Sequence, residues 1–345
     1  MISRVADHCF WFGRYVERAE STARMLAASV HLALDGDLPP AHVWRPVLVV
    51  AGVEDEFRRR ITGGLESSGS AGPRSDAEGH RGGWIDDHPA WGDGEVVQRF
   101  MAWDEDNGVS LARSVIGARW NARSIREVLS LEAWETVNEL HLWWRSDGAR
   151  AGYTQHREAF YQHVRRSTQL TLGLLRSTML HDEPLDFVWL GVLLERVSQT
   201  ARMLDVHHHA FTNLAPRTGD TVVETALWLS LLRALSGGEA YMKRAAGRVD
   251  PEGVGRFLVS EPAFPRSIAY CVHSAYERLC DIRPPEHAQL PGGVSLERLR
   301  VLDERVAAHR DRPLGSAEVH GLLTHVVDEV HEICTTLGRE LFGVP

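Results

Sequence analysis

The sequence predicts an all-α protein of about ten to twelve helices, built from two duplicated halves that pack as one unit. The first observation is a repeat: Trp11–Leu26 returns 178 positions later as Trp189–Leu204, with nine of the sixteen aligned residues identical. Average composition would give about one identity by chance. The second observation is an apolar stripe with the 3.6-residue helical period in Val319–Leu337. Together they indicate packed amphipathic helices that arose from a duplicated helical unit.

The first half is expected to cover residues 1–181. Its first helix runs from an N-cap at Ser3 to residue 34, where Asp35, Gly36 and two prolines stop it. The other helices expected in this half cover residues 44–61, 95–103, 111–127, 131–144 and 153–180. Residues 63–93 are rich in glycine, serine and proline, so we expect a flexible, glycine-rich surface loop there.

The second half, residues 182–345, begins with the repeated helix, which we expect to end at Asp205–His209. The other helices expected in this half cover residues 220–237 and onward to 246, 253–260, 295–309 and 316–341. Ser110 in the first half and Ser267 in the second each precede an apolar residue at an expected helix start. Their matching order supports a duplication of the whole half.

Composition and charge exclude several classes of protein. The 345 residues carry a net charge of −9, which argues against a nucleic-acid-binding protein, because such proteins present a basic surface. No run approaches the roughly 20 apolar residues of a membrane span, and the amphipathic start is no signal peptide. The four cysteines lack Cys-x-x-Cys spacing, so we expect reduced thiols in a cytoplasmic protein.

The repeated segment carries a narrow polar stripe on an otherwise apolar helix. On a helical wheel Arg24 falls within about 40° of Glu17, and Arg202 aligns with Glu195 in the same way. A helix that is apolar nearly all round is buried, and buried charges need partners. Gly13 within the first copy indicates a close approach of another helix or of a ligand, because glycine weakens a helix interior.

Two interpretations of this stripe stay open. In the first, the charges form a structural salt-bridge layer with neighbouring helices. In the second, both copies line a ligand cleft between the halves, in which arginines clamp a carboxylate or phosphate and Glu17 and Glu195 are acid–base candidates.

A second group of arginines follows the turn at residues 104–110. Arg119, Arg123 and Arg126 recur at spacings that place them on one helical face, and Asn121 lies among them. Three guanidinium groups on one face repel one another, so they require acidic partners or an anion. Nearby glutamates provide structural partners; a carboxylate or phosphate pocket is the alternative.

The ligand-binding candidates are the members of these two groups. They are Glu17, Arg18, Arg24, Arg119, Asn121, Arg123, Arg126, Glu195, Arg196 and Arg202. No catalytic residue is named, because the sequence holds no P-loop, dinucleotide fingerprint, Gly-x-Ser-x-Gly elbow or His-Glu-x-x-His motif. No metal site is predicted: Asp205 with His209 has suitable helical spacing, but a solvated or salt-bridged cluster explains them equally.

Several long, ungapped motifs resemble the bacterial alpha-E domain family. They are Ser3–Asp7, Trp11–Arg24, Ala118–Glu127, Glu132–Glu135 with Asn138, and Gly191 with Glu195-Arg196. The resemblance covers nearly the whole chain outside residues 63–93. One departure is the loss of the family's usual proline at Gly108, so we expect a looser turn before the following helix.

The resemblance implies a wholly helical protein that is encoded beside, or fused to, a circularly permuted ATP-grasp ligase, often with a transglutaminase-like protein nearby. It therefore implies a non-catalytic helical partner or substrate-binding subunit of an amide or peptide ligase system. ATP and magnesium would belong to the ligase, and we expect no cofactor in this chain. The alternative is an enzyme, or a small-anion-binding protein for a peptide or carboxylate, with its cleft between the halves.

Overall fold

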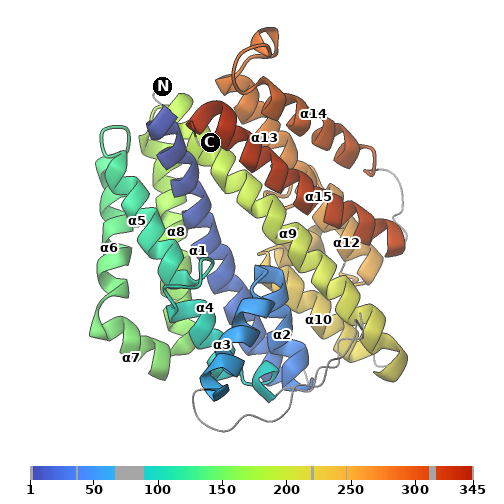
Figure 1. The fold of residues 1–345 in the computed structure, drawn as a ribbon. Helices are drawn as coiled ribbons and strands as arrows, with labels where there is room; N and C mark the ends of the chain where they lie inside the picture. The colour runs from blue at the N-terminus through green and yellow to red at the C-terminus, as the bar shows by residue number, and fades with distance from the viewer. Residues whose placement is uncertain are drawn as a thin grey trace.

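The computed structural model describes most of the chain and confirms the all-α fold. The described residues are 3–35, 38–66, 89–218, 221–245, 247–310 and 316–343. They form fifteen α-helices and no strand (Figure 1). No helix in these ranges combines the length and the apolar content needed to cross a membrane.

Two long helices form the centre of the bundle. They are α1 (Ser3–Asp35) and α9 (Glu183–Thr218), which carry the two copies of the repeated segment and pack against each other (Figure 1). The predicted bounds of α1 are confirmed. The predicted end of α9 at His209 is wrong, because no helix-stopping residue follows there and the helix continues to Thr218.

The two central helices are covered in the same order. On one side α5 (Leu111–Ser124) and α8 (Arg157–Thr178) pack on α1, and α6 (Leu131–Trp144) contacts both of them. The packing on α9 repeats this order, with α13 and α15 against α9 and α14 against both. These three helices are α13 (Ile268–Ile282), α14 (Gly293–Ala307) and α15 (Ser316–Leu337). Duplication of complete halves stays a prediction.

Seven shorter α-helices of the described chain pack around these elements. They are α2 (Pro40–Ala51), α3 (Glu54–Glu66), α4 (Gly94–Trp103), α7 (Asp147–Gln155), α10 (Thr221–Ala234), α11 (Gly238–Arg244) and α12 (Pro251–Ser260). Two 3₁₀ turns and a π-helical turn complete the described structure: Pro89–Trp91, Pro285–His287 and Gly338–Phe342.

The number of helices exceeds the predicted ten to twelve partly because two expected helices are each divided. Gly52 adopts φ +71° and ends α2, because this left-handed conformation is favourable for glycine. The expected helix 153–180 is divided at His156, since the Ser146 hydroxyl caps a separate helix α7. Each division depends on the conformation of a single residue, Gly52 in one case and His156 in the other. Helical periodicity does not reveal such a conformation.

The predicted serine caps are confirmed. Ser110 and Ser267 each accept a hydrogen bond from the backbone N–H three residues later, at the starts of α5 and α13. The turn before α5 is held firmly despite the missing proline. The Asp104 carboxylate accepts from two backbone N–H groups of the turn, and the Asn107 amide donates to the backbone oxygen of Phe100 at 3.1 Å.

The prediction of a glycine-rich loop at 63–93 is wrong at both ends of this segment. Residues 63–66 continue α3, and Pro89–Trp91 form a 3₁₀ turn. Residues 67–88 lie outside the described part of the chain, so the prediction for them stays a prediction.

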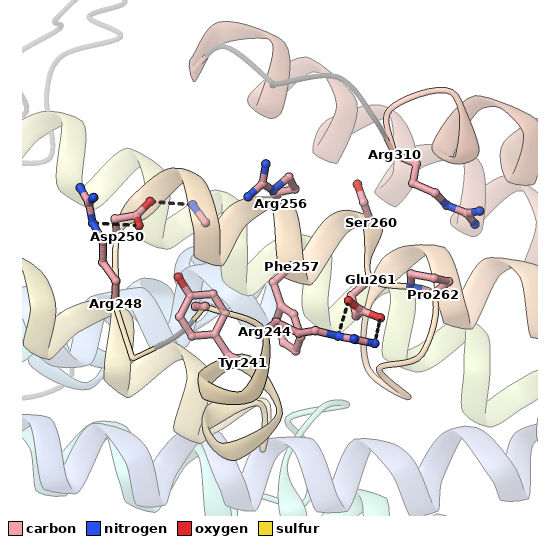
Figure 2. Close-up of a pocket in the computed structure, with 12 residues that line it drawn as sticks. Tyr241, Arg244, Arg248, Asp250, Arg256, Phe257, Ser260, Glu261, Pro262 and Arg310 are labelled. Atoms are coloured by element: carbon pink, nitrogen blue, oxygen red, sulfur yellow. Dashed lines mark hydrogen bonds and ion pairs between the residues drawn. The ribbon is translucent and has the colours of Figure 1, made fainter.

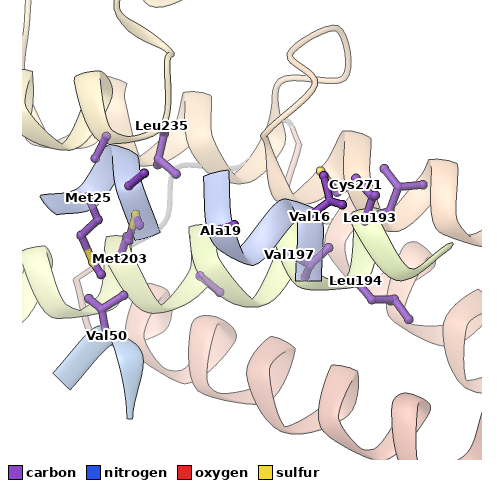
Figure 3. Close-up of a cluster of buried hydrophobic side chains, with 14 of the residues drawn as sticks. Val16, Ala19, Met25, Val50, Leu193, Leu194, Val197, Met203, Leu235 and Cys271 are labelled. Atoms are coloured by element: carbon purple, nitrogen blue, oxygen red, sulfur yellow. The ribbon is translucent and has the colours of Figure 1, made fainter. Parts of the chain in front are cut away.

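Apolar side chains fill the contact between α1 and α9. Figure 3 shows Val16 and Met25 of α1 among Leu193, Val197 and Met203 of α9, and all five are buried. Each buried side chain of this size stabilises the fold by about 1.5–3 kcal/mol through removal of apolar surface from water. The central contact is therefore primarily hydrophobic.

Two glycines let the backbones of α1 and α9 approach closely. A Cβ added to Gly13 would lie 2.1 Å from the backbone oxygen of Val188, and one added to Gly191 would lie 2.1 Å from that of Phe10. Since Val188 and Phe10 are equivalent in the repeat, the contact is reciprocal. The repeated glycine thus lies at a helix crossing. Of the two predicted reasons for the glycine, a close helix or a close ligand, the structure shows the close helix.

Replacement of Gly13 by alanine is expected to lower the free energy of unfolding by about 1–3 kcal/mol, because the added methyl group would overlap backbone atoms of α9. Urea unfolding followed by circular dichroism measures the change. Gly173→Ala is the matched control: Gly173 is exposed within α8, with nothing within 4 Å of an added Cβ. There alanine is expected to stabilise by about 0.4–1 kcal/mol. Equal effects of the two substitutions would contradict the close contact.

Candidate functional site

The repeated glutamates lie in a buried layer between the two central helices. Glu17 of α1 accepts a hydrogen bond at 2.8 Å from Nε of Arg196 on α9. Its other oxygen accepts one at 2.6 Å from Arg266, which precedes α13. The layer thus ties α1 to α9 and to the start of α13.

The second copy makes the reciprocal contact. Glu195 of α9 accepts hydrogen bonds from Nε of Arg18 at 2.7 Å and from Nε of Arg14 at 2.8 Å. Because Arg18 and Arg196 are equivalent in the repeat, each Glu-Arg dipeptide supplies the glutamate for the other's arginine. We call Glu17, Arg18, Glu195 and Arg196, with Arg14 and Arg266, the Glu–Arg layer.

The arginines of this layer determine the charge state of Glu195. Burial alone would raise the pKa of Glu195, but Arg18 and Arg14 outweigh burial and hold it well below its usual range. The same contact with Glu195 contributes to a raised pKa of Arg14, against the effect of burial. Glu195 is therefore ionised at neutral pH, where it has no proton to donate.

The Glu–Arg layer supports the structural interpretation of the polar stripe, and the alternative of a ligand cleft between the halves stays a hypothesis. Glu17 is fully buried and Glu195 is 2% exposed, and each carboxylate accepts bonds from two arginines. Neither Glu17 nor Glu195 lines either of the two cavities described below. Glu17, Arg18, Glu195 and Arg196 thus come together as predicted, but they contact one another instead of a ligand.

The remaining arginine of each repeat copy lies farther along its helix. Arg24 donates through Nε to Glu20 at 3.0 Å, within α1, and also contacts the Ser236 hydroxyl. Arg202 has no equivalent bond, because Ser198 stands where the first copy has Glu20. Burial lowers the pKa of Arg202. The two copies are therefore alike at the layer and diverge one turn beyond it.

The predicted arginine face on α5 does not form. The helix ends at Ser124, so Arg126 lies in the following turn. The guanidinium groups of Arg119 and Arg126 lie over the Trp134 ring, 5.9 Å and 4.9 Å from its centroid, and Arg119 also donates to Asn138 at 3.0 Å. The nearby glutamates expected as partners are Glu127, Glu132 and Glu135, and none of them makes an ion pair with these arginines in the described structure.

Arg123 and Asn121, the other two candidates in this segment, lie apart from Arg119 and Arg126. Arg123 is exposed on the opposite part of the surface of α5 from the buried Asn121. The Asn121 side chain bonds the His8 ring at 2.9 Å and the backbone oxygen of Gly117 at 2.8 Å. Asn121 therefore joins α5 to α1 as a structural contact. The group forms no common pocket.

The spacing of Asp205 and His209 does bring potential metal ligands together, with a third that the sequence did not indicate. His320 of α15 lies beside them, with its Nδ1 2.7 Å from Oδ1 of Asp205. One potential ligand atom from each of the three residues lies within 4.8 Å of the others. The hydrogen bonds of Asp205 with each histidine and the edge-to-face contact of the His209 and His320 rings account for this geometry without a metal.

A cavity that lies elsewhere was not predicted from the sequence. It has a volume of about 410 Å³ and is formed by α11, α12 and the segment after α14 (Figure 2). Four arginines line it: Arg244, Arg248, Arg256 and Arg310. Arg244, Arg248 and Arg256 come from α11, from the connection after it and from α12, and Arg310 is distant in sequence. Only the density of arginine around residue 250 could therefore have indicated the site.

A second cavity is much smaller and mainly apolar. It measures about 40 Å³ and lies between α1, α2, α9 and α10. His207 lines it, and burial lowers the pKa of His207 to about 4. A neutral histidine in an apolar cavity of this size indicates a packing feature and not a ligand site.

The substitution Glu195→Gln is expected to lower the free energy of unfolding by about 3–5 kcal/mol, because Arg14 and Arg18 would lose their shared counter-charge inside the protein. Equilibrium urea unfolding measures the loss. Glu297→Gln is a matched control, since Glu297 also begins a Glu-Arg dipeptide but its side chain is 61% exposed. We expect that control to leave unfolding nearly unchanged; similar losses in both variants would contradict a structural layer.

Comparison with known proteins identifies the family. Neither a search of curated proteins nor a search of solved structures finds a match. A family model named Alpha-E, described as a predicted alpha-helical domain with a conserved ER motif, matches residues 1–342. Five Glu-Arg dipeptides occur in the sequence, and the two repeated ones form the buried layer. The chain belongs to the Alpha-E family.

Proposed function

We propose that this protein is a non-catalytic, substrate-binding partner of an ATP-grasp ligase that forms amide or peptide bonds. The observation that carries the proposal is the Glu–Arg layer, in which both acid–base candidates are buried and held by arginines. Membership of the Alpha-E family supports the association with a ligase through the resemblance described above.

General acid–base catalysis requires a group whose pKa lies near the working pH and which reaches the reacting atoms. Glu195 meets neither requirement, because its arginines hold its pKa low and fill the space around it. Glu17 is enclosed in the same way. The alternative of an enzyme with these glutamates in an inter-half cleft thus loses the groups on which it depended.

In this proposal the ligase provides the chemistry. It binds ATP and magnesium, activates a carboxylate and joins it to an amine, while the Alpha-E protein binds the ligase, the substrate, or both. A transglutaminase-like protein is a further proposed partner. We place the system in the cytoplasm, where ATP is abundant and where the four free thiols of Cys9, Cys271, Cys280 and Cys334 stay reduced.

An ATP-dependent ligation assay tests the proposal. Product formation is measured with the ATP-grasp ligase alone, with this protein alone, and with both, using a peptide acceptor. We expect the mixture to form product at least about tenfold faster than the ligase alone, because positioning of a substrate lowers the entropic part of the barrier. This protein alone is expected to form none.

Two outcomes would contradict the proposal. A ligase that reaches its full rate alone would show that no partner is needed, and ATP-dependent product from this protein alone would favour the enzyme alternative. The Gly173→Ala variant provides a folded control, because its substitution lies on an exposed part of α8 with open space around it. It is expected to stimulate the ligase as the unmodified protein does.

A further inference from the structure

We propose that the arginine-lined cavity between α11 and α12 binds a small oxyanion, a phosphate or a carboxylate, attached to a flat apolar group. Its volume of about 410 Å³ falls in the range of small-molecule sites. The inference deepens the proposed function by naming a substrate class, but binding to the cavity requires no ligase. The two proposals can therefore fail separately.

The charges lining the cavity favour an anion. Arg244 is paired with Glu261 at 3.1 Å and Arg248 lies 3.6 Å from Asp250, so these two arginines are already balanced (Figure 2). Arg256 and Arg310 make no ion pair within the described structure, although both line the cavity. The lining thus has two more positive than negative groups. Guanidinium groups suit phosphate and carboxylate because they donate paired hydrogen bonds.

A buried hydroxyl gives independent support for a ligand. Ser260 is 4% exposed and lines the cavity, and its Oγ has no hydrogen-bond partner in the described structure. Buried polar groups without partners are rare in folded proteins. Ser260 lies one helical turn after Arg256 on α12, so the two side chains share a face of that helix. An oxyanion between them would accept from both.

Aromatic rings form the apolar part of the cavity. Tyr241 of α11 and Phe257 of α12 line it and meet edge to face, with ring centroids 5.4 Å apart. Phe264 stacks behind Phe257 at 4.7 Å and supports it. Burial raises the pKa of Tyr241, so its hydroxyl stays protonated at neutral pH. A ligand with a flat apolar group beside its oxyanion would contact both the arginines and these rings.

Isothermal titration calorimetry of the complete chain tests the inference with three probes: inorganic phosphate, phenyl phosphate and benzoate. We expect phenyl phosphate to bind at least about tenfold more tightly than inorganic phosphate, because only the former contacts the aromatic rings. Comparison of phenyl phosphate with benzoate distinguishes a phosphate site from a carboxylate site. Binding should weaken as salt is added, since the arginines are partly exposed to water.

The double variant Arg256→Ala, Arg310→Ala is expected to weaken binding of the tightest probe at least about tenfold, through loss of charge-assisted hydrogen bonds. The double variant Arg113→Ala, Arg166→Ala removes the same charge from exposed positions away from the cavity and should bind within about twofold of the unmodified protein. Ser260→Ala is expected to weaken binding severalfold.

Two results would overturn the inference: no binding of any probe at millimolar concentration, or unchanged binding in the Arg256→Ala, Arg310→Ala variant. Thermal unfolding of each variant shows whether it is folded. Should the double variant be unfolded, Arg256→Gln and Arg310→Gln, made singly, provide the same comparison. Unaltered anion binding with no stimulation of the ligase would overturn the proposed function alone.

Discussion

The structure depends on one contact, the crossing of α1 and α9 at Gly13 and Gly191. At this point the two backbones are too close for any side chain, and the reciprocal geometry brings each Glu-Arg dipeptide opposite the other. Buried charges are costly unless paired, so the four central charges restrict the register of the two helices. A shift of α1 along α9 would separate both ion pairs and bring the glycines out of contact.

This constraint gives a physical meaning to the Glu-Arg motif in the description of the Alpha-E family. In this chain the two repeated Glu-Arg dipeptides join two helices, and Arg14 and Arg266 add a second guanidinium group to each carboxylate. The hydrophobic contacts along α1 and α9 provide most of the stabilisation, while the charges define how the helices are aligned. The proposed binding function therefore involves positions outside the crossing of α1 and α9.

The cavity between α11 and α12 holds its arginines in a different environment. Its arginines lie at a concave surface in which water and solutes reach Arg256 and Arg310, and its carboxylates balance only part of the positive charge. The arginines of the Glu–Arg layer, in contrast, are largely buried, and each donates to Glu17 or Glu195. Arginine thus has a structural role where it is buried against a carboxylate, and we propose a binding role where it is exposed at a cavity without one.

The sequence by itself determined the helical content, the repeated segment, and the expectation that Glu17 and Glu195 are buried and paired, because these properties follow from local periodicity. The serine caps before α5 and α13 were also predictable, because capping depends on the type of residue at the start of a helix. Only the tertiary structure decided which arginine meets which glutamate. Arg266 reaches Glu17 from 249 positions away, and Arg310 joins α12 at the cavity through the packing of α14. Such pairings depend on how helices cross, and helical periodicity carries no information about crossings.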